Sequence, residues 1–431
     1  MSPTSTLMPS LAPSLQHPQS LELLHRLSRS AVPRAGETGP IAKGLACQRE
    51  MFSLPPGTHY LNCAYMAPLS QAVEQAGVAA LVRSRYPAEV PPGDYFRWPD
   101  AVRQAFARLV HVDDPRRIAL LPSVSYAMAV ATRNIPAARG QNVVVIGQEF
   151  PSAVLPWRRL VRERNLVLRT VDPPRSATPG ADWNARLHAA IDAGTAAVVL
   201  AHVHWSDGTR FDVKALAARA REVGAVVVVD GTQSVGALPF DVRRVQPDLL
   251  VCSGYKWLLS QYGLSVAYFG ERFDHGSPLE ETWTSQCGSE DFARLAEYRD
   301  AYGPMARRYD GGQRASFVLA PMLCAAIEQL LAWDVAKIQR YCERLLAPWL
   351  ERLTEYGVAL APPEERASHL VGLRVTQSCD LTVLADQLAA RQVSVSVRGD
   401  VIRVSPHLYN DEHDMAALFA TLGQVLGTRV S

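Results

Sequence analysis

The sequence lacks the features that would mark a disulfide-stapled, zinc-binding or membrane-spanning protein. Its seven cysteines are scattered and form no Cys-x-x-Cys pair, so neither a disulfide framework nor a zinc site is indicated. No apolar run approaches the roughly 20 residues that cross a bilayer. Lysine and arginine total 44 against 42 acidic residues, a net charge of +2, which implies no nucleic-acid or membrane partner. We therefore expect reduced thiols and a cytoplasmic location.

Acidic residues are scarce in the first 45 positions, where Glu22 and Glu37 are the only two. The segment is rich in serine, proline, leucine and arginine, a composition typical of disordered chain and similar to a transit peptide. It has no compact apolar core of the kind found in a secretory signal. We expect a disordered extension at 1–45, with an overlong start or a targeting sequence as the alternatives. The remaining length is enough for two domains with a substantial core.

Two apolar runs in the middle of the chain each end at a polar residue. Ala225–Val229 is followed by Asp230, and Leu249–Cys252 is followed by Ser253 and then Lys256. Such runs are typical of buried parallel strands, whose carboxyl ends carry the ligand sites of open α/β sheets. An acid and a lysine there suit pyridoxal phosphate (PLP), which needs a lysine amine for its Schiff base and a carboxylate beside its ring nitrogen. Taken alone, the acid could cap a helix and the lysine could be solvated.

The residues at these strand ends resemble a known family, the fold-type I PLP enzymes of aminotransferase class V. That family includes cysteine desulfurases, kynureninases and isopenicillin-epimerase-like proteins, and its motif runs Asp-Gly/Ala-x-Gln-Ser and later Ser-Gly/x-His/Tyr-Lys. The chain has Asp-Gly-Thr-Gln-Ser at 230–234 and Ser-Gly-Tyr-Lys at 253–256. It also matches the family's C-terminal pattern Arg-x-Ser/Ala-x-x-x-Tyr-Asn at 403–410.

The resemblance implies a role for each of several residues toward the cofactor. Lys256 would carry the cofactor and, once freed, would act as general base at the substrate's alpha carbon. Asp230 would keep the pyridine nitrogen protonated, and Gln233 would hydrogen-bond the phenol oxygen. Phe150 would stack on the cofactor ring. Ser125, Ser253 and Tyr255 would hold its phosphate.

The resemblance also assigns roles to arginines. Arg403 would bind the substrate's alpha carboxylate through a bidentate pair, with Arg398 as a weaker candidate. In the family, a residue just after a glycine pair, here 311–312, reaches the phosphate bound in the neighbouring subunit. Gln313 or Arg314 would do so, and Arg314 is preferred because its planar guanidinium suits phosphate. We therefore expect a homodimer with shared active sites.

The chain departs from the cysteine desulfurases where those enzymes carry a nucleophilic cysteine. The segment 394–400, which precedes Arg403, contains no cysteine, and Cys379 lies well upstream. Tyr255 stands where desulfurases have histidine, and a tyrosine at this position is similar to kynureninases. We expect no catalytic cysteine, with Cys63 as the one alternative, because it lies in the N-terminal segment that approaches the substrate in the family.

The order of elements predicts an α/β fold. Strands are expected at 118–121, 142–146, 166–171, 196–201, 225–229, 249–252 and 265–269. Helices alternate with them, which predicts a mostly parallel, seven-stranded-type sheet with right-handed crossovers, as in PLP fold-type I. The expected division is a large PLP-binding domain at 46–325 and a small α+β domain at 326–431. His202 and His204 have no third ligand nearby, so we expect no metal site.

The expected function is that of a PLP enzyme acting on a small amino acid by removing its alpha proton. A transaminase or a beta-eliminating C–S lyase ranks first, and an epimerase or kynureninase-like hydrolase ranks second. A PLP-binding regulatory protein without turnover is the alternative of another class. The residues named do not decide which bond breaks after the proton is removed, because one fold supports many reactions.

Overall fold

The computed structural model describes residues 44–174, 179–353, 357–376 and 380–427. The extension expected at 1–45 falls outside these residues up to position 43, and so does Cys379. The strands are β1 (His59–Tyr60), β2 (Ile118–Leu121), β3 (Asn142–Ile146), β4 (Val167–Val171), β5 (Thr195–Ala201), β6 (Val226–Asp230), β7 (Leu249–Ser253), β8 (Ser265–Phe269), β9 (Val358–Ala359), β10 (Val371–Val375), β11 (Val393–Ser394), β12 (Ser396–Arg398) and β13 (Val401–Val404). The α-helices are α2 (Gln71–Ser84), α3 (Asp94–Leu109), α4 (Val124–Asn134), α5 (Pro151–Arg164), α6 (Pro179–Ala190), α7 (Val213–Glu222), α8 (Val242–Val245), α9 (Leu319–Trp333), α10 (Val335–Leu350), α11 (Leu381–Ala390) and α12 (Glu412–Gly427).

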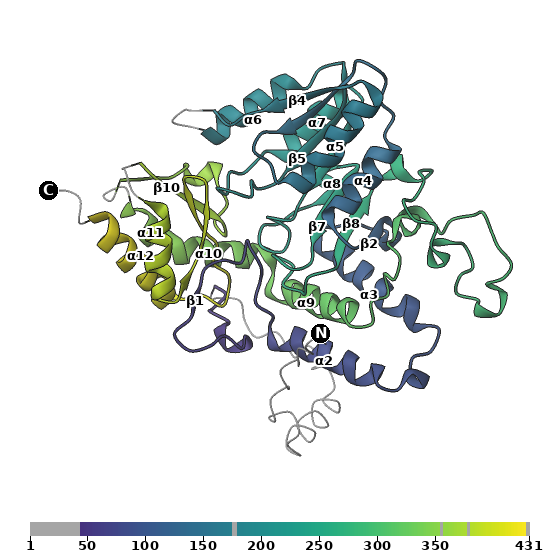
Figure 1. Cartoon of the computed structure of the whole chain (residues 1–431), viewed down its shortest axis with the longest axis horizontal. Coiled ribbons are helices and arrows are strands. Elements are labelled where there is room, and N and C mark those ends of the chain that lie inside the picture. Colours follow the sequence, from purple (N-terminus) through teal and green to yellow (C-terminus); the bar gives the residue numbers. More distant parts are fainter. Residues whose placement is uncertain (1–43, 175–178, 354–356, 377–379, 428–431) are drawn as a thin grey trace, which may run out of the picture.

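A seven-stranded sheet in the order β2-β8-β7-β6-β5-β3-β4 forms the centre of the molecule (Figure 1). The five strands from β7 to β4 run parallel, which confirms the expected mostly parallel sheet. Strand β8 differs from the expectation, because it pairs antiparallel with both β7 and β2. The segment from β7 to β8 contains no helix, and a parallel return requires a long crossover connection.

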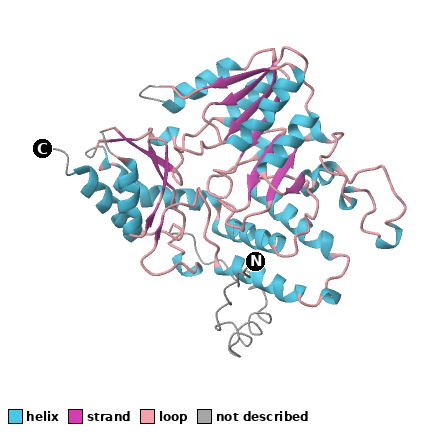
Figure 2. Cartoon of the chain, in the orientation of Figure 1, coloured by secondary structure: helices cyan, strands magenta, loops and turns pink. Residues whose placement is uncertain are grey.

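Both faces of the large sheet are covered by helices (Figure 2). Along β3, Val143 and Val145 pack in one core with α4 and α5, while Val144 and Ile146 point into the core on the other face. That second core includes side chains of α3 and α7. Strands buried on both sides need apolar residues at every position, which is why they appear in the sequence as unbroken runs of valine and leucine.

A second, antiparallel sheet in the order β12-β13-β10-β9 lies beside the large one and packs with α10, α11 and α12 (Figure 1). The N-terminal strand β1 pairs in parallel with β11, so the segment around 46–62 contacts this C-terminal part. The domain boundaries at 325 and 326 stay a prediction. The pairing of β1 with β11 brings the chain around residues 62–67 to lie between the two sheets, since the Ala67 N–H donates to the Tyr255 carbonyl at 2.9 Å.

The apolar segment 320–349 consists of two helices, α9 and α10. Asp334 separates α9 from α10 with φ of +68°, and its carboxylate accepts the N–H of Ala336 at 3.0 Å as an N-cap. Helix α3 begins at Asp94 and accommodates Pro99 inside the helix. The chain therefore turns between α9 and α10 at Asp334, whose capping role a purely apolar pattern does not reveal.

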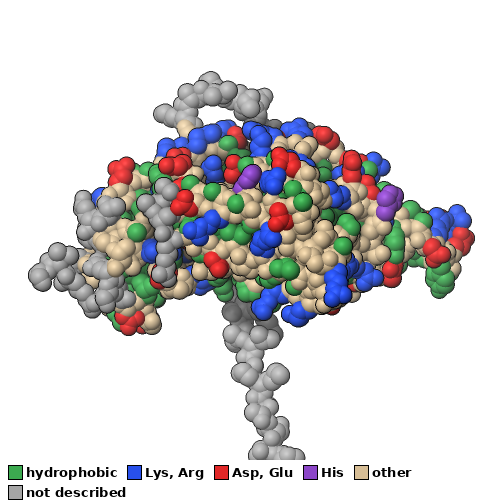
Figure 3. Space-filling view, turned by 90° about the horizontal axis from the view of Figure 1, so that it is seen from above, with side chains coloured by type: hydrophobic (Ala, Val, Ile, Leu, Met, Phe, Trp, Pro, Cys, Tyr) green, Lys and Arg blue, Asp and Glu red, His purple; other side chains and the backbone are tan. Residues whose placement is uncertain are grey.

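The surface carries charges of both signs. On the face seen in Figure 3, lysine and arginine side chains are interspersed with aspartate and glutamate, in keeping with the near balance of the whole sequence. Within the described residues, no single helix has the length and apolar character that a membrane span requires, although α9 and α10 meet that test together as a pair bent by 71°.

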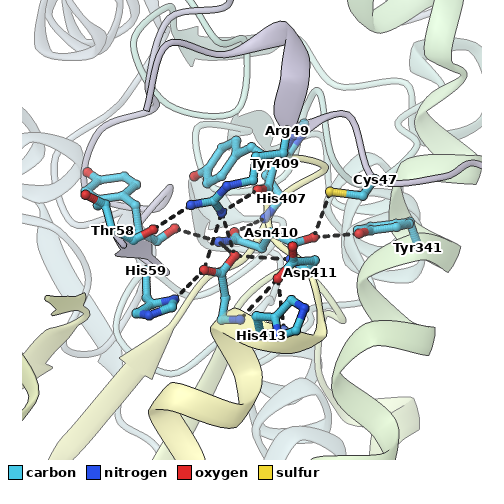
Figure 4. Close-up of polar contacts among 12 residues, drawn as sticks. Cys47, Arg49, Thr58, His59, Tyr341, His407, Tyr409, Asn410, Asp411 and His413 are labelled. Carbon is cyan, nitrogen blue, oxygen red and sulfur yellow. Dashed lines mark hydrogen bonds and ion pairs between the residues drawn. The ribbon is translucent and has the colours of Figure 1, made fainter. Parts of the chain in front are cut away.

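A buried carboxylate, Asp414, joins the N-terminal segment to helix α12. Its oxygens accept from Arg49 Nη1 at 3.1 Å, from His59 Nδ1 at 2.7 Å and from Asn410 Nδ2 at 2.9 Å. Figure 4 shows Arg49, His59 and Asn410 reaching this point from different segments of the chain. The Asp414 side chain is only 1% exposed, so its charge depends on these partners for solvation.

We expect Asp414→Ala to lower the free energy of unfolding by about 3 kcal/mol, because the substitution removes one partner of a buried ion pair and several charge-assisted hydrogen bonds. This expected loss of stability lies at the lower end of the range for breaking a buried ion pair, because the side chains of Arg49 and His59 keep some exposure, 30% and 22%. Urea unfolding followed by circular dichroism measures it. Glu412→Ala, at an exposed position in the same helical turn, is the matched control. Equal stability of the two variants would contradict the anchoring role.

Candidate active site

A cavity opens at the carboxyl ends of three parallel strands, β5, β6 and β7. Its wall also includes the first residues of helices α4 and α5, so two helix N-termini border the same space. Of the residues predicted for the site, the following line it: Ser125, Phe150, Asp230, Gln233, Ser253, Tyr255 and Lys256. The structure therefore brings together seven side chains that are spread over more than 130 positions of sequence.

Lys256 is buried in this cavity, with 9% of its surface exposed. Its Nζ lies 5.5 Å from the centre of the Phe150 ring and 5.7 Å from that of Tyr255. Burial, with a contribution from nearby Arg403, lowers the pKa of the amine to about 8, against the partial opposition of Asp230. A lysine whose pKa is lowered in this way carries more of the free amine at neutral pH than a solvated lysine does. The free amine is the form that acts as nucleophile and base.

Asp230 ends strand β6 and is held by the turn that follows. Its Oδ1 accepts the N–H of Thr232 at 2.8 Å, and Thr232 Oγ1 in turn accepts the N–H of Ser253 at 3.3 Å. Burial raises the pKa of Asp230, while Thr232 and Lys256 lower it. A buried carboxylate at the cavity wall is stabilised when a cationic group approaches it, which is what a protonated pyridine nitrogen would provide.

Gln233 presents a fixed amide to the cavity. Its Oε1 accepts from Trp257 Nε1 at 2.8 Å, and its Nε2 donates to the Ala64 carbonyl at 3.1 Å. Because an amide nitrogen carries two hydrogens, one remains to donate toward an oxygen in the cavity. The backbone carbonyl of Gln233 also accepts from His369 Nε2 at 2.7 Å, which further fixes the residue.

The serine-rich end of the cavity is suited to an anion. Ser123 caps helix α4, since its Oγ accepts the N–H of Tyr126 at 3.1 Å, and it lies 2.9 Å from Ser125 Oγ. Hydroxyl groups and free N–H groups at a helix N-terminus form a phosphate site. The Ser253–Tyr255 turn lines the same cavity, and a side chain at Gly254 would come within 2.6 Å of the Leu264 carbonyl. Only glycine permits this approach of the strands on either side.

Phe150 and Trp205 form an aromatic wall beside Lys256. Their rings meet edge to face, with centroids 5.5 Å apart and an interplanar angle of 77°. Phe150 precedes helix α5 and remains 41% exposed, and Trp205 Nε1 donates to the Gln148 carbonyl at 2.8 Å. A phenylalanine held over a cavity can stack on a flat ligand ring but cannot transfer a proton.

Two arginines of the small sheet lie beside the cavity without a carboxylate partner among the described residues. Arg403 is 2% exposed, and its Nη1 donates to the Trp205 carbonyl at 2.7 Å while its Nε has no hydrogen-bond partner. The Arg398 guanidinium lies 5.9 Å from the centre of the Trp205 ring. Burial and the charge of Arg398 lower the pKa of Arg403 to about 10. A buried cation such as Arg403, without a carboxylate partner among the described residues, favours an incoming carboxylate.

Arg314 is not brought to the cavity. It is 3% exposed and its Nε pairs with Asp310 Oδ2 at 3.0 Å, within a buried cluster that also holds Arg103. Gln313 beside it is exposed and has φ of +59°. Of the two residues considered for a contact to a neighbouring subunit, the placement favours Gln313, because Arg314 would first have to leave its ion pair.

The cysteines near the cavity are protected from reaction. Cys63 is fully buried, and burial raises the pKa of its thiol to about 12. Cys252 lies inside strand β7, where burial and Asp230 also raise its pKa. Thiolates are the reactive form, so burial disfavours the nucleophilic state of both groups.

Sequence reasoning missed several residues of the site, among them Thr232, Trp257 and Glu149. Thr232 lies within the motif 230–234 and Trp257 directly follows the lysine motif, and they orient Asp230 and Gln233. Glu149 lines the cavity immediately before Phe150. An acid that closely follows the apolar strand β3 was the available signal, of the same kind that identified Asp230.

The residues fit pyridoxal phosphate. A buried amine of lowered pKa, a carboxylate able to face a pyridinium, a remaining amide hydrogen and a serine-lined helix N-terminus share one cavity. These are the four kinds of group that the cofactor's aldehyde, ring nitrogen, phenol oxygen and phosphate require.

The chain is similar to known proteins over most of its length. A family model described as Aminotransferase class-V matches residues 97–418. Isopenicillin N epimerase of Amycolatopsis lactamdurans is 26% identical over 403 residues, which cover 89% of this chain and 99% of that protein. A probable cysteine desulfurase of Methanothermobacter thermautotrophicus is 33% identical over 331 residues, covering 72% of this chain and 79% of that protein. A structure of C-DES with glycine covalently linked to its PLP cofactor superposes with a TM-score of 0.77 at 19% identity, covering 88% of this chain and 99% of that one.

Proposed function

Because the chain belongs to the aminotransferase class V family, we propose that it removes the alpha proton of a small amino acid and then expels a beta substituent, as a C–S lyase does. The chain is a PLP-dependent enzyme of the transaminase, lyase or epimerase type, with the PLP type I fold. The observation that carries the proposal is that Lys256, with its lowered pKa, shares one cavity with Asp230 and lies near the unpaired Arg403.

When bound, pyridoxal phosphate supplies an aldehyde that captures an amine and a protonated ring that draws electrons from the substrate's alpha carbon. Lys256 would hold the cofactor and, once displaced by the substrate amine, take the alpha proton on Nζ. Asp230 would keep the ring nitrogen protonated, and Gln233 would donate to the phenol oxygen. Ser125, Ser253 and Tyr255 would hold the phosphate, and Phe150 would cover the ring and exclude water.

Elimination from the substrate is favoured over transfer of sulfur to the protein. The segment before Arg403 has no cysteine, and the thiols of Cys63 and Cys252 are buried with raised pKa values. The sulfur of a cysteine-like substrate would therefore leave as a small molecule.

The products test the proposed reaction. Purified enzyme is incubated with L-cystine, L-cysteine or L-alanine, and the visible absorption of the cofactor is followed. Pyruvate and ammonia formed without an added keto acid support the lyase. Products only in the presence of a keto-acid acceptor would make the enzyme a transaminase, and inversion to the D-amino acid would make it an epimerase. An absorption spectrum that no amino acid changes would contradict an enzymatic role.

Arg403→Gln should raise KM for the amino acid about 100-fold and change kcat much less, because a charge-assisted pair to the carboxylate contributes about 1.5–3 kcal/mol to substrate binding. Steady-state kinetics with the active substrate measures both constants. Arg391→Gln, at an exposed position of the same small domain, is the control. An unchanged KM in Arg403→Gln would remove the arginine from the carboxylate site.

The proposal includes a homodimer in the cytoplasm. Exposed aromatic side chains support an interface in the segment after β8: Trp283 is 41% exposed and Tyr298 is 95% exposed. The described cysteines are free thiols, in keeping with a reducing compartment. Sedimentation velocity should give a dimer at micromolar concentration, and a monomer with full activity would contradict shared active sites.

A further inference from the structure

Glu149 is an acid of the cavity to which the proposed function gives no task. It follows strand β3 and lines the same space as Lys256 and Asp230. Its Oε1 accepts the N–H of Phe150 at 2.6 Å, whereas its Oε2 is buried and has no hydrogen-bond partner among the described residues. A buried carboxylate oxygen without a donor is costly, so the group is stable there mainly when it carries a proton.

Three titratable groups interact electrostatically with Glu149, each from at or just beyond the end of a different strand. His204 follows β5, Asp230 ends β6 and Lys256 follows β7. Burial raises the pKa of Glu149 to about 7; His204 and Lys256 lower it, and Asp230 raises it. The carboxyl group is therefore an acid that can both give up and regain a proton near neutral pH, the condition for efficient general acid catalysis.

His204, one of these groups, contacts a carboxylate that reaches solvent, Asp207. His204 is 1% exposed, and its Nδ1 lies 3.3 Å from Asp207 Oδ1 and 2.9 Å from Ser206 Oγ. The Asp207 side chain is 25% exposed. Burial opposes protonation of His204, but Asp207 and Glu149 together raise its pKa. Burial likewise opposes ionisation of Asp207, but His204 lowers the pKa of that carboxyl group. The imidazole therefore contacts a carboxylate that reaches water and also interacts electrostatically with Glu149.

We propose that Glu149 is the general acid that protonates the leaving group, with His204 and Asp207 as positioning residues that reload it. The inference rests on the proposed beta elimination. Lys256 takes the alpha proton, the electrons of that C–H bond form the new C=C bond, and the electrons of the C–S bond leave on sulfur. Glu149 Oε2 gives its proton to that sulfur, and a thiol departs. Glu149 then takes a proton from His204, which regains one from solvent through the Asp207 side.

The test compares two leaving groups. A thiolate requires a proton as it leaves, whereas chloride does not. Glu149→Gln should therefore lower kcat for S-methyl-L-cysteine by on the order of 10²-fold, while changing turnover of 3-chloro-L-alanine less than about threefold. Glu163→Gln, an exposed position on α5, is the matched control. Equal losses on both substrates, or no loss on either, would overturn the proposal, as would loss of cofactor binding by Glu149→Gln.

A spectroscopic measurement separates this proposal from the proposed function. At pH 6 the wild-type protein should show an infrared C=O band of a protonated carboxyl group that disappears as the pH rises through 7 and is absent from Glu149→Gln. His204→Gln should shift that titration. If the wild type fails to act on 3-chloro-L-alanine, the proposed function fails, and the infrared titration alone decides Glu149. Absence of a titrating carboxyl group would then overturn its assignment as an acid.

Discussion

Lys256→Ala should abolish turnover, with kcat falling by about 10⁴-fold or more, because the substitution removes both the group that holds the cofactor and the base that takes the alpha proton. The other described groups of the cavity offer no second amine, since the described residues include three lysines, and Lys214 and Lys337 are exposed on α7 and α10. Pyruvate formation from the best substrate, measured after incubation with excess cofactor, gives the loss.

Lys214→Ala is the control for that experiment, and it should retain wild-type turnover. Wild-type turnover in Lys256→Ala would show that the catalytic amine lies elsewhere, and the cavity would lose its assignment. A partial return of activity on addition of a small alkyl amine would support the role of the missing side chain as a base.

Asp230→Ala should lower kcat by on the order of 10²-fold or more while some cofactor remains bound, because a ring nitrogen without a facing carboxylate loses its proton and withdraws electrons less. Steady-state kinetics and the visible spectrum of the variant measure the two effects separately. Asp386→Ala, at an exposed position on α11, is the control. An Asp230→Ala variant as active as the wild type would refute the role of this carboxylate.

The elements of the large sheet were predictable because their physical cause is local. Each central strand is buried on both faces, so it needs an unbroken apolar run, and runs such as 142–146 and 249–252 match β3 and β7. The strand order and the antiparallel β8 were not predictable in the same way. They depend on which edges pair in space, and the residues of β8 are as apolar as those of a parallel strand.

The chemistry of the site was predictable where a motif carries it. Asp230, Gln233 and Lys256 lie within two short stretches at strand ends, and the structure places all three on one cavity. Arg314 shows the limit, since a guanidinium that suits phosphate also suits a buried carboxylate, and here Asp310 is its partner. Glu149 escaped notice because its meaning depends on burial and on neighbours from other strands, such as His204.

Borohydride reduction tests the central claim most directly. Reduction of the yellow holoenzyme, digestion and mass mapping identify the lysine that carries the pyridoxyl group, and with only four lysines in the chain the result is unambiguous. The account predicts the label on Lys256 and none on Lys214 or Lys337. A pyridoxyl group on another lysine, or protein that binds the cofactor without forming the bond, would contradict it.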